Sequence, residues 1–381
     1  MVKFPANRQA LYYAFDETAT LSPWSITVNT PSSLSTAANA ADLIIISDSA
    51  PTFMTAAGVW ATYRRNQGFT VKVIDVADIF DEFNYGTSSA VSLKSFLNYA
   101  YTNWQTPPKY VLLLGDASYD PRNYEGYGAW NLIPTKYASG IYAEDPSDEA
   151  LADFNCDGLA EMAIGRIPAH YAGDITTAYN KVVLFETPQL QSLDRGILFA
   201  YDQSNDYNFQ GFSESFRNLF PASMPASFVS KGQSEANTTL INEMNNGRYL
   251  VNYSGHGATG IWSSSTFFSV NHVVQLSNTS RPSIYTMLTC LNGFFTRPNA
   301  DSLAEVLMRW PNGGAVAAWS STGETTPDYQ NTMATRFFDQ LNKGNIKRLG
   351  DLIRDAKTTV AGTDVAFSWS LLGDPMLKVR Q

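Results

Sequence analysis

Short apolar runs alternate with amphipathic segments along the first half of the chain. Three runs rich in β-branched residues predict buried strands, and the two segments between them have helical periodicity. The strands are expected at 42–47, 69–74 and 110–114, and the helices at 52–67 and 88–104. A strand–helix–strand–helix–strand order predicts a parallel sheet covered by helices on both faces.

The same alternation resumes after a linker at 188–194, whereas residues 1–40 are irregular. Later strands are expected at 195–201, 226–230, 249–254, 283–288 and 314–319. Later helices are expected near 209–219, 236–246, 299–309, 328–342 and 346–360. We therefore predict an α/β protein with three αβα layers. It would comprise an irregular or β-rich segment 1–40, which could be the tail of a preceding domain, and then subdomains 41–190 and 191–381.

Two neighbouring strands of the second half each end in a residue able to do chemistry. His256, between Gly255 and Gly257, follows strand 249–254, and Cys290 comes 34 positions later, after strand 283–288. A short helical pattern near 270–276 separates them, so the unit should be parallel and right-handed. Carboxyl ends of neighbouring parallel strands face one crevice, which would place the imidazole beside the thiol.

A thiol beside an imidazole is a nucleophile beside its base. The backbone N–H groups of Gly257 and Cys290 would then be positioned to stabilise a developing oxyanion. The alternative is an inert buried cysteine and an ordinary hydrogen-bonded histidine, because both are common. Spacing alone does not decide between the two interpretations.

Sequence motifs around these two residues resemble the gingipain family of cysteine peptidases. The stretches that carry the resemblance are Asn-Tyr-Ser-Gly-His-Gly at 252–257 and Thr-Cys-Leu-Asn-Gly-Phe-Phe at 289–295. Weaker agreement occurs in order at 110–116, 161–166, 303–309 and 369–375. The resemblance extends from about Ala41 to the end of the chain. It implies a caspase-like subdomain over 191–381, a smaller Rossmann-like subdomain before it, and cysteine endopeptidase activity.

A third group is expected to orient the histidine base. Gingipains have a glutamate at the end of the strand that corresponds to 195–201, and Asp202 stands there in this chain. Asp206 is the nearby rival, and a simple loop-capping role for Asp202 is the alternative. We predict that Asp202 assists His256.

The substrate pocket is harder to predict. By position, its neighbours would be Ser254, Leu288 and Trp319, with Glu324 as a carboxylate able to receive a basic side chain. The aspartate that arginine-specific gingipains place at the pocket base has no aligned counterpart. Cleavage after arginine is therefore not implied by the resemblance.

An acidic loop before the strand expected at 162–165 resembles the first part of a calcium loop. Its oxygen donors alternate, and a glycine and a carboxylate follow. The predicted ligands are Asp153, Asn155, Asp157, the carbonyl of Leu159, and Glu161. Gingipain-like domains carry calcium, so a structural Ca²⁺ is expected, with no organic cofactor. The alternative is an Asx-rich turn without metal.

Composition restricts the possible partners. The chain has 381 residues, 26 basic against 35 acidic, and a net charge of −9, which argues against a nucleic-acid partner. Its two cysteines lie in unrelated motifs and do not form a disulfide framework. No apolar run has the ~20 residues of a membrane helix, and we expect the first residues not to be a signal peptide, because no apolar segment follows them. We expect a secreted or cell-surface bacterial protein that is part of a longer multidomain chain.

Three functions follow from these observations. The first is a cysteine endopeptidase that acts on protein or peptide substrates. The second is a maturation protease of a bacterial surface-secretion system, with the same chemistry and dedicated substrates. The third is a calcium-stabilised adhesive module with a vestigial site, against which the retention of both His256 and Cys290 argues.

Overall fold

The computed structural model describes residues 15–23, 26, 28–264 and 266–380. The chain divides into two units, residues 1–32 and residues 33–381. Within the first unit, the described residues include a short 3-10 helix, η1 (Glu17–Ala19). Parts of the irregular segment predicted at 1–40 lie outside the described residues. The second unit contains both predicted subdomains.

The elements of the second unit alternate as the sequence predicts. The strands of its main sheet are β1 (Leu43–Ser47), β2 (Val71–Asp75), β3 (Tyr110–Leu114), β6 (Ala163–Ile167), β7 (Ile197–Tyr201), β8 (Ala226–Ser230), β9 (Leu250–Ser254), β13 (Ser283–Leu288), β14 (Ala315–Ser321) and β15 (Trp369–Leu372). Smaller strands are β4 (Lys136–Ser139), β5 (Glu144–Ser147), β10 (Gly257–Ala258), β11 (Ile261–Trp262) and β12 (Phe268–Ser269).

Helices connect most of these strands. They are α1 (Pro51–Arg65), α2 (Val76–Asn84), α3 (Ala90–Asn103), α4 (Glu149–Ala152), α5 (Ala172–Phe185), α6 (Pro188–Ser192), α7 (Phe209–Asn218), α8 (Ala236–Asn245), α9 (Leu303–Arg309), α10 (Pro327–Lys343), α11 (Leu349–Lys357) and α12 (Asp364–Ser368). Two 3-10 helices, η2 (Val270–Gln275) and η3 (Thr358–Val360), complete the set.

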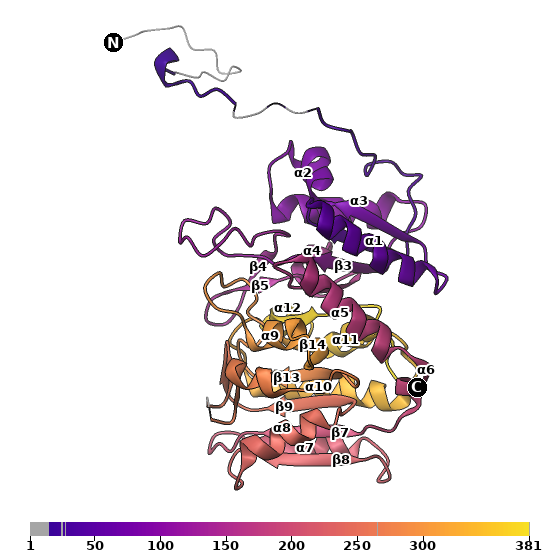
Figure 1. The fold of residues 1–381 in the computed structure, drawn as a ribbon, viewed down its shortest axis with the longest axis vertical. Helices are drawn as coiled ribbons and strands as arrows, with labels where there is room; N and C mark the ends of the chain where they lie inside the picture. Colours follow the sequence, from indigo (N-terminus) through magenta and orange to yellow (C-terminus); the bar gives the residue numbers. More distant parts are fainter. Residues whose placement is uncertain (1–14, 24–25, 27, 265, 381) are drawn as a thin grey trace. The chain divides into compact units, whose positions relative to one another are not determined.

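A single ten-stranded sheet runs through the second unit in the order β2-β1-β3-β6-β15-β14-β13-β9-β7-β8. The labels β3, β14, β13, β9, β7 and β8 follow one another in this order in Figure 1. Central strands such as β1 and β13 are buried along their whole length, which explains their continuous apolar runs. The sheet has helices on both faces, and the predicted three-layer α/β class is confirmed.

Strand β15 joins the two halves. It pairs antiparallel with β14 and meets β6 through a single residue pair, Leu372 with Arg166. The strands within each half pair in parallel. The Tyr119 N–H, after β3, donates to the Thr296 carbonyl, after β13, so the carboxyl ends of the two halves meet at the same edge of the sheet. A fully parallel arrangement had been predicted within each half, and β15 had not been predicted as a strand.

Several local differences have simple causes. Helix α1 begins at Pro51, which suits the first helical turn, one position before the predicted start at 52. The unpredicted helix α2 is capped by Asp75, whose carboxylate accepts the N–H of Ala77. The predicted linker at 188–194 contains the short helix α6. The long loop at 123–149 contains the β4–β5 hairpin.

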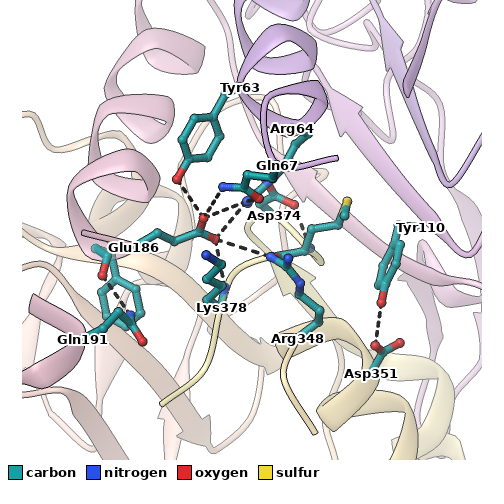
Figure 2. A network of polar contacts seen from close by, with 12 residues as sticks. Tyr63, Arg64, Gln67, Tyr110, Glu186, Gln191, Arg348, Asp351, Asp374 and Lys378 are labelled. Carbon is teal, nitrogen blue, oxygen red and sulfur yellow. Dashed lines mark hydrogen bonds and ion pairs between the residues drawn. The ribbon is translucent and has the colours of Figure 1, made fainter. Parts of the chain in front are cut away.

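A buried ion cluster ties the first half to the end of the chain (Figure 2). The fully buried guanidinium of Arg64, on α1, contacts Glu186 at 2.8 Å and Asp374 at 2.6 Å. The Tyr63 hydroxyl donates to Glu186 and the Trp60 indole donates to Asp374. These groups come from α1, the end of α5 and the segment after β15, so the cluster fixes the two halves together.

Candidate active site

His256 and Cys290 lie at the same rim of the sheet. Strands β9 and β13 are neighbours and parallel, and the last residues of the two strands, Ser254 and Leu288, are paired in register. Each candidate residue comes two positions after its paired strand end. The predicted strand–helix–strand geometry is thus confirmed, with the 3-10 helix η2 as part of the connection.

Contacts on three sides fix the position of His256. Its carbonyl accepts hydrogen bonds from the Tyr253 hydroxyl at 2.6 Å and from the Ser263 N–H at 2.7 Å. The hydroxyl of Ser204 lies 3.4 Å from Nε2 of the ring. The rings of Phe209 and His256 pack edge-to-face, with their centroids 5.4 Å apart. The ring is nevertheless exposed and accessible to a substrate.

Cys290 is half-buried beside the loop that follows β14. Its Sγ donates to the Thr325 carbonyl at 3.6 Å, and the N–H of Leu291 donates to the Gly323 carbonyl. Burial raises the pKa of the Cys290 thiol, and the carboxylates of Glu324 and Asp145 raise it further. The thiol is therefore protonated at neutral pH and needs a base to become a nucleophile.

The glycine after the histidine is required by close packing. A Cβ atom on Gly257 would lie 2.4 Å from Thr289 Oγ1 and 2.9 Å from the Ile261 carbonyl oxygen. No side chain fits at this distance, so only glycine lets the turn lie against the Cys290 segment. Gly257 and Cys290 are thus held in neighbouring segments, as an oxyanion site would require.

Asp202 lies at the carboxyl end of β7 and is buried. Its N–H donates to the Ser254 carbonyl, and its Oδ1 accepts the N–H of Gln203 at 2.8 Å and lies 3.4 Å from Lys231 Nζ. Within the described part of the chain, no hydrogen bond joins its carboxylate to His256. Direct orientation of the imidazole by Asp202 therefore stays a prediction, because the two side chains are not hydrogen-bonded in this structure.

The rival acid, Asp206, is exposed on the loop after β7. The Asp206 N–H donates to Ser204 Oγ at 3.1 Å. Asp206 and Asp202 both line an open pocket of about 560 Å³. Ser204 also contacts His256, but its bond with Asp206 is made by the backbone N–H, so among the described contacts none joins the Asp206 carboxylate to the imidazole.

Three of the four predicted pocket residues do not line an open surface. Ser254, Leu288 and Trp319 are buried. The Trp319 ring packs against the rings of Phe337 and Trp369, within the core. Contact of these side chains with substrate stays a prediction, and as strand residues of a covered sheet they are packed against helices in this arrangement. Glu324, in contrast, is exposed on the loop after β14.

The structure adds an acidic residue that the sequence did not indicate. Asp145, on β5, is only 5% exposed, and its Oδ2 has no hydrogen-bond partner. The carboxylate lies against Gly323, in the loop beside Cys290. Burial raises the pKa of Asp145 to about 6, with further contributions from Asp364 and Glu324. Asp364 Oδ2 is likewise buried and unpartnered.

The predicted calcium loop brings three carboxylates together. Ligand oxygens of Asp153, Asp157 and Glu161 lie within 4.8 Å of one another. Asp153 accepts the N–H groups of Cys156 and Gly158, which folds the loop around its carboxylates. Such a set of hard oxygen donors suits Ca²⁺.

The other two predicted ligands make different contacts. The Asn155 amide donates to Asp157 Oδ2 at 3.0 Å, and the N–H of Leu159 donates to Asp157 Oδ1 at 2.9 Å. These bonds stabilise the turn with its carboxylates close together, and leave the assignment of Asn155 and the Leu159 carbonyl as ligands a prediction.

Comparison with known proteins identifies the family. The sequence model of peptidase family C25 matches residues 36–380. The chain belongs to peptidase family C25. This membership confirms the predicted gingipain-like cysteine peptidase class, and it implies protein or peptide substrates.

Relatives of the chain are gingipains. Gingipain R2 of Porphyromonas gingivalis strain W83 is 24% identical over 317 residues, which span 77% of this chain and 40% of that protein. Gingipain R1 of Porphyromonas gingivalis is also 24% identical, over 319 residues that span 77% of this chain and 30% of that protein. The chain thus corresponds to less than half of each of these relatives.

Solved structures show the same fold. The complex of the Porphyromonas gingivalis RgpB pro- and mature domains aligns with a TM-score of 0.73 and 21% identity, over 89% of this chain and 79% of that one. The Arg-specific cysteine proteinase gingipain R aligns with a TM-score of 0.72 and 21% identity, over 88% and 78% of the two chains.

Proposed function

We propose that the protein is a cysteine endopeptidase whose nucleophile is Cys290 and whose general base is His256. The observation that carries this proposal is the in-register pairing of β9 with β13, which delivers both residues to one rim. Because burial raises the thiol pKa, the imidazole must remove the proton as the sulfur attacks.

The reaction follows from these roles. His256 accepts the Sγ proton while the sulfur bonds to the scissile carbonyl carbon. The N–H groups of Gly257 and Cys290 stabilise the resulting oxyanion. When the C–N bond breaks, His256 returns the proton to the leaving amine, and a thioester remains. Water, deprotonated by His256, then attacks the thioester and regenerates the thiol.

The acidic surroundings of Cys290 support a preference for basic substrate side chains. Asp364 and Glu324 both act electrostatically on Asp145, and Asp145 and Asp364 each carry a buried unpartnered oxygen. A buried carboxylate without a partner is costly, and a substrate guanidinium or ammonium would relieve this cost. The name of the related Arg-specific gingipain R agrees with such a preference.

A P1 peptide library measured with wild-type protein and with Cys290→Ala tests the proposal. We expect turnover of peptides with Arg or Lys at P1 and none by the variant. Cys156→Ala is the matched control, because Cys156 is the other free cysteine and is exposed on the calcium loop. Activity that survives Cys290→Ala would refute the assignment and favour the vestigial module. Turnover of dedicated protein substrates but of no library peptide would favour the maturation protease.

We also propose that Asp153, Asp157 and Glu161 hold a structural Ca²⁺. Three carboxylates this close repel one another unless a cation neutralises them. The ion would hold the loop that leads into β6. Chelation should therefore lower the melting temperature without a direct role in the chemistry.

Secretion or display at the cell surface is likewise a proposal. The gingipain relatives and the low content of charged residues, 16%, support it. Among the described residues, no helix is both long and apolar enough to cross a membrane.

A further inference from the structure

The His256–Gly257 peptide is held by two donors on its carbonyl side. The buried hydroxyl of Tyr253 and the N–H of Ser263 both bond to the His256 carbonyl. A peptide bond is planar and trans, so its C=O and N–H point in opposite directions. Fixing the His256 carbonyl therefore also fixes the direction of the Gly257 N–H, the donor proposed for the oxyanion.

One of these donors is itself held in an unusual backbone conformation. Ser263 has φ of +51°, a left-handed value that is uncommon for a residue with a Cβ atom. Such a conformation persists only when the surroundings impose it. The Ser263 hydroxyl accepts a hydrogen bond from Lys231 Nζ at 2.6 Å, which connects this turn to the end of β8.

The same ammonium lies 3.4 Å from Asp202 Oδ1. Asp202 is rigidly placed, because it is buried and both its N–H and its Oδ1 are hydrogen-bonded. The N–H of Lys231 donates to the Tyr201 carbonyl, so the base of this side chain is also fixed. A continuous chain of contacts thus runs from Asp202 through Lys231 and Ser263 to the His256 carbonyl.

We propose that Lys231 is a positioning residue that couples Asp202 to the His256–Gly257 peptide and so aims the Gly257 N–H at the oxyanion. The inference rests on the proposed peptidase function. In this proposal Asp202 does not contact the imidazole directly. The Asp202 carboxylate holds the Lys231 ammonium, and the ammonium holds the turn at Ser263. The Tyr253 hydroxyl donates the second hydrogen bond to the His256 carbonyl.

The competing interpretation is an ordinary surface ion pair. The Lys231 side chain is 37% exposed, and exposed pairs contribute little to stability. That interpretation predicts no change in catalysis when the lysine is removed. A purely structural role predicts a lower melting temperature and a damaged site as a whole. Positioning predicts a selective loss of kcat.

The test is steady-state kinetics of Lys231→Met in the full chain with a fluorogenic peptide. Removal of an oxyanion donor costs about 10²–10³ in kcat, and a misaimed donor should cost about 10–100-fold. We expect this loss in kcat, a KM within about twofold of wild type, and an unchanged melting temperature. Alkylation of Cys290 by iodoacetamide should keep its rate, because displacement of iodide forms no oxyanion.

Matched variants make each outcome decisive. Lys231→Arg should restore most of the activity, and Lys343→Met, which removes an exposed lysine paired with Asp339, should have no effect. Ser263→Ala removes only the hydroxyl that Lys231 contacts and should reproduce the kcat loss even if Lys231→Met folds poorly.

Wild-type kcat in both Lys231→Met and Ser263→Ala would overturn the inference. Equal losses in kcat, alkylation rate and melting temperature would also overturn it, in favour of a structural role. Failure of the proposed function is separable, since it would appear as retained activity in Cys290→Ala.

Discussion

Replacement of Asp145 by asparagine tests the proposed basic preference and reports on stability at the same time. Burial raises the pKa of Asp145 from 3.8 to about 6. This rise in pKa corresponds to ~3 kcal/mol of unfavourable surroundings for the ionised form, which we discount to ~2 kcal/mol for screening by water. A substrate cation placed beside the carboxylate would recover a similar amount.

The assay compares two peptides that differ only at P1, arginine against its uncharged isostere citrulline. At pH 8, Asp145→Asn should lower kcat/KM for the arginine peptide by about 30-fold, the equivalent of ~2 kcal/mol. The citrulline peptide should show no loss, because it places no cation beside residue 145. In the wild type, the preference for arginine should decline below pH 6, as Asp145 becomes protonated. Glu144→Gln is the control, because Glu144 is an exposed neighbouring carboxylate on the same strand.

Stability should change in the opposite direction. The native state binds this proton more tightly than the unfolded state between about pH 4 and 6, so Asp145 costs stability above pH 6. Asp145→Asn should therefore raise the melting temperature at pH 8 and leave it unchanged at pH 4. An arginine preference that Asp145→Asn leaves intact, or a parallel loss for both peptides, would refute the reasoning.

Three further predictions concern the scaffold. Arg64→Met should destabilise the protein by about 3–5 kcal/mol in urea unfolding at pH 7, since it leaves buried carboxylates unpaired. Burial acts to raise the pKa of Glu186, but Arg64 holds it below its ordinary value. The stabilisation by this ion pair is therefore lost as the pH falls through that low pKa. A loss of stability under 1 kcal/mol for Arg64→Met at pH 7 would contradict the account. Burial lowers the pKa of Lys181 to about 7, so the stability of the wild type should rise from pH 7 to 10. Lys181→Met should abolish this rise. An equal rise in both proteins would contradict the prediction. Calcium at 100 times its Kd should add ~2.7 kcal/mol of stability. Asp157→Asn should remove this gain, and the exposed control Asp328→Asn should not. Equal calcium responses of the two variants would argue against the site.

The sequence predicted the parts of the site that depend on local pattern. The apolar runs before His256 and Cys290 define strand ends, and the parallel rule places those ends at one rim. The three clustered carboxylates of the acidic loop were also predicted, because their alternation is local.

Contacts between segments distant in the chain could not be predicted. Asp145 reaches Gly323 only because the β4–β5 hairpin folds back toward the loop after β14. The contact of Lys231 with Ser263 depends likewise on how two loops meet at the rim. Strand β15 is a four-residue run whose antiparallel place between β14 and β6 is set by tertiary packing. The sequence also did not show that the strand residue Trp319 faces the core.

The central claim is that His256 activates Cys290 at a shared rim, and covalent labelling tests it most directly. Wild-type protein, treated with a peptidyl acyloxymethyl ketone that carries arginine at P1, is digested and the adduct is located by mass spectrometry. The account predicts one adduct, on Cys290, which forms about 100-fold more slowly in His256→Ala because the base is missing. An adduct on Cys156 alone, or a labelling rate that His256→Ala leaves unchanged, would contradict it.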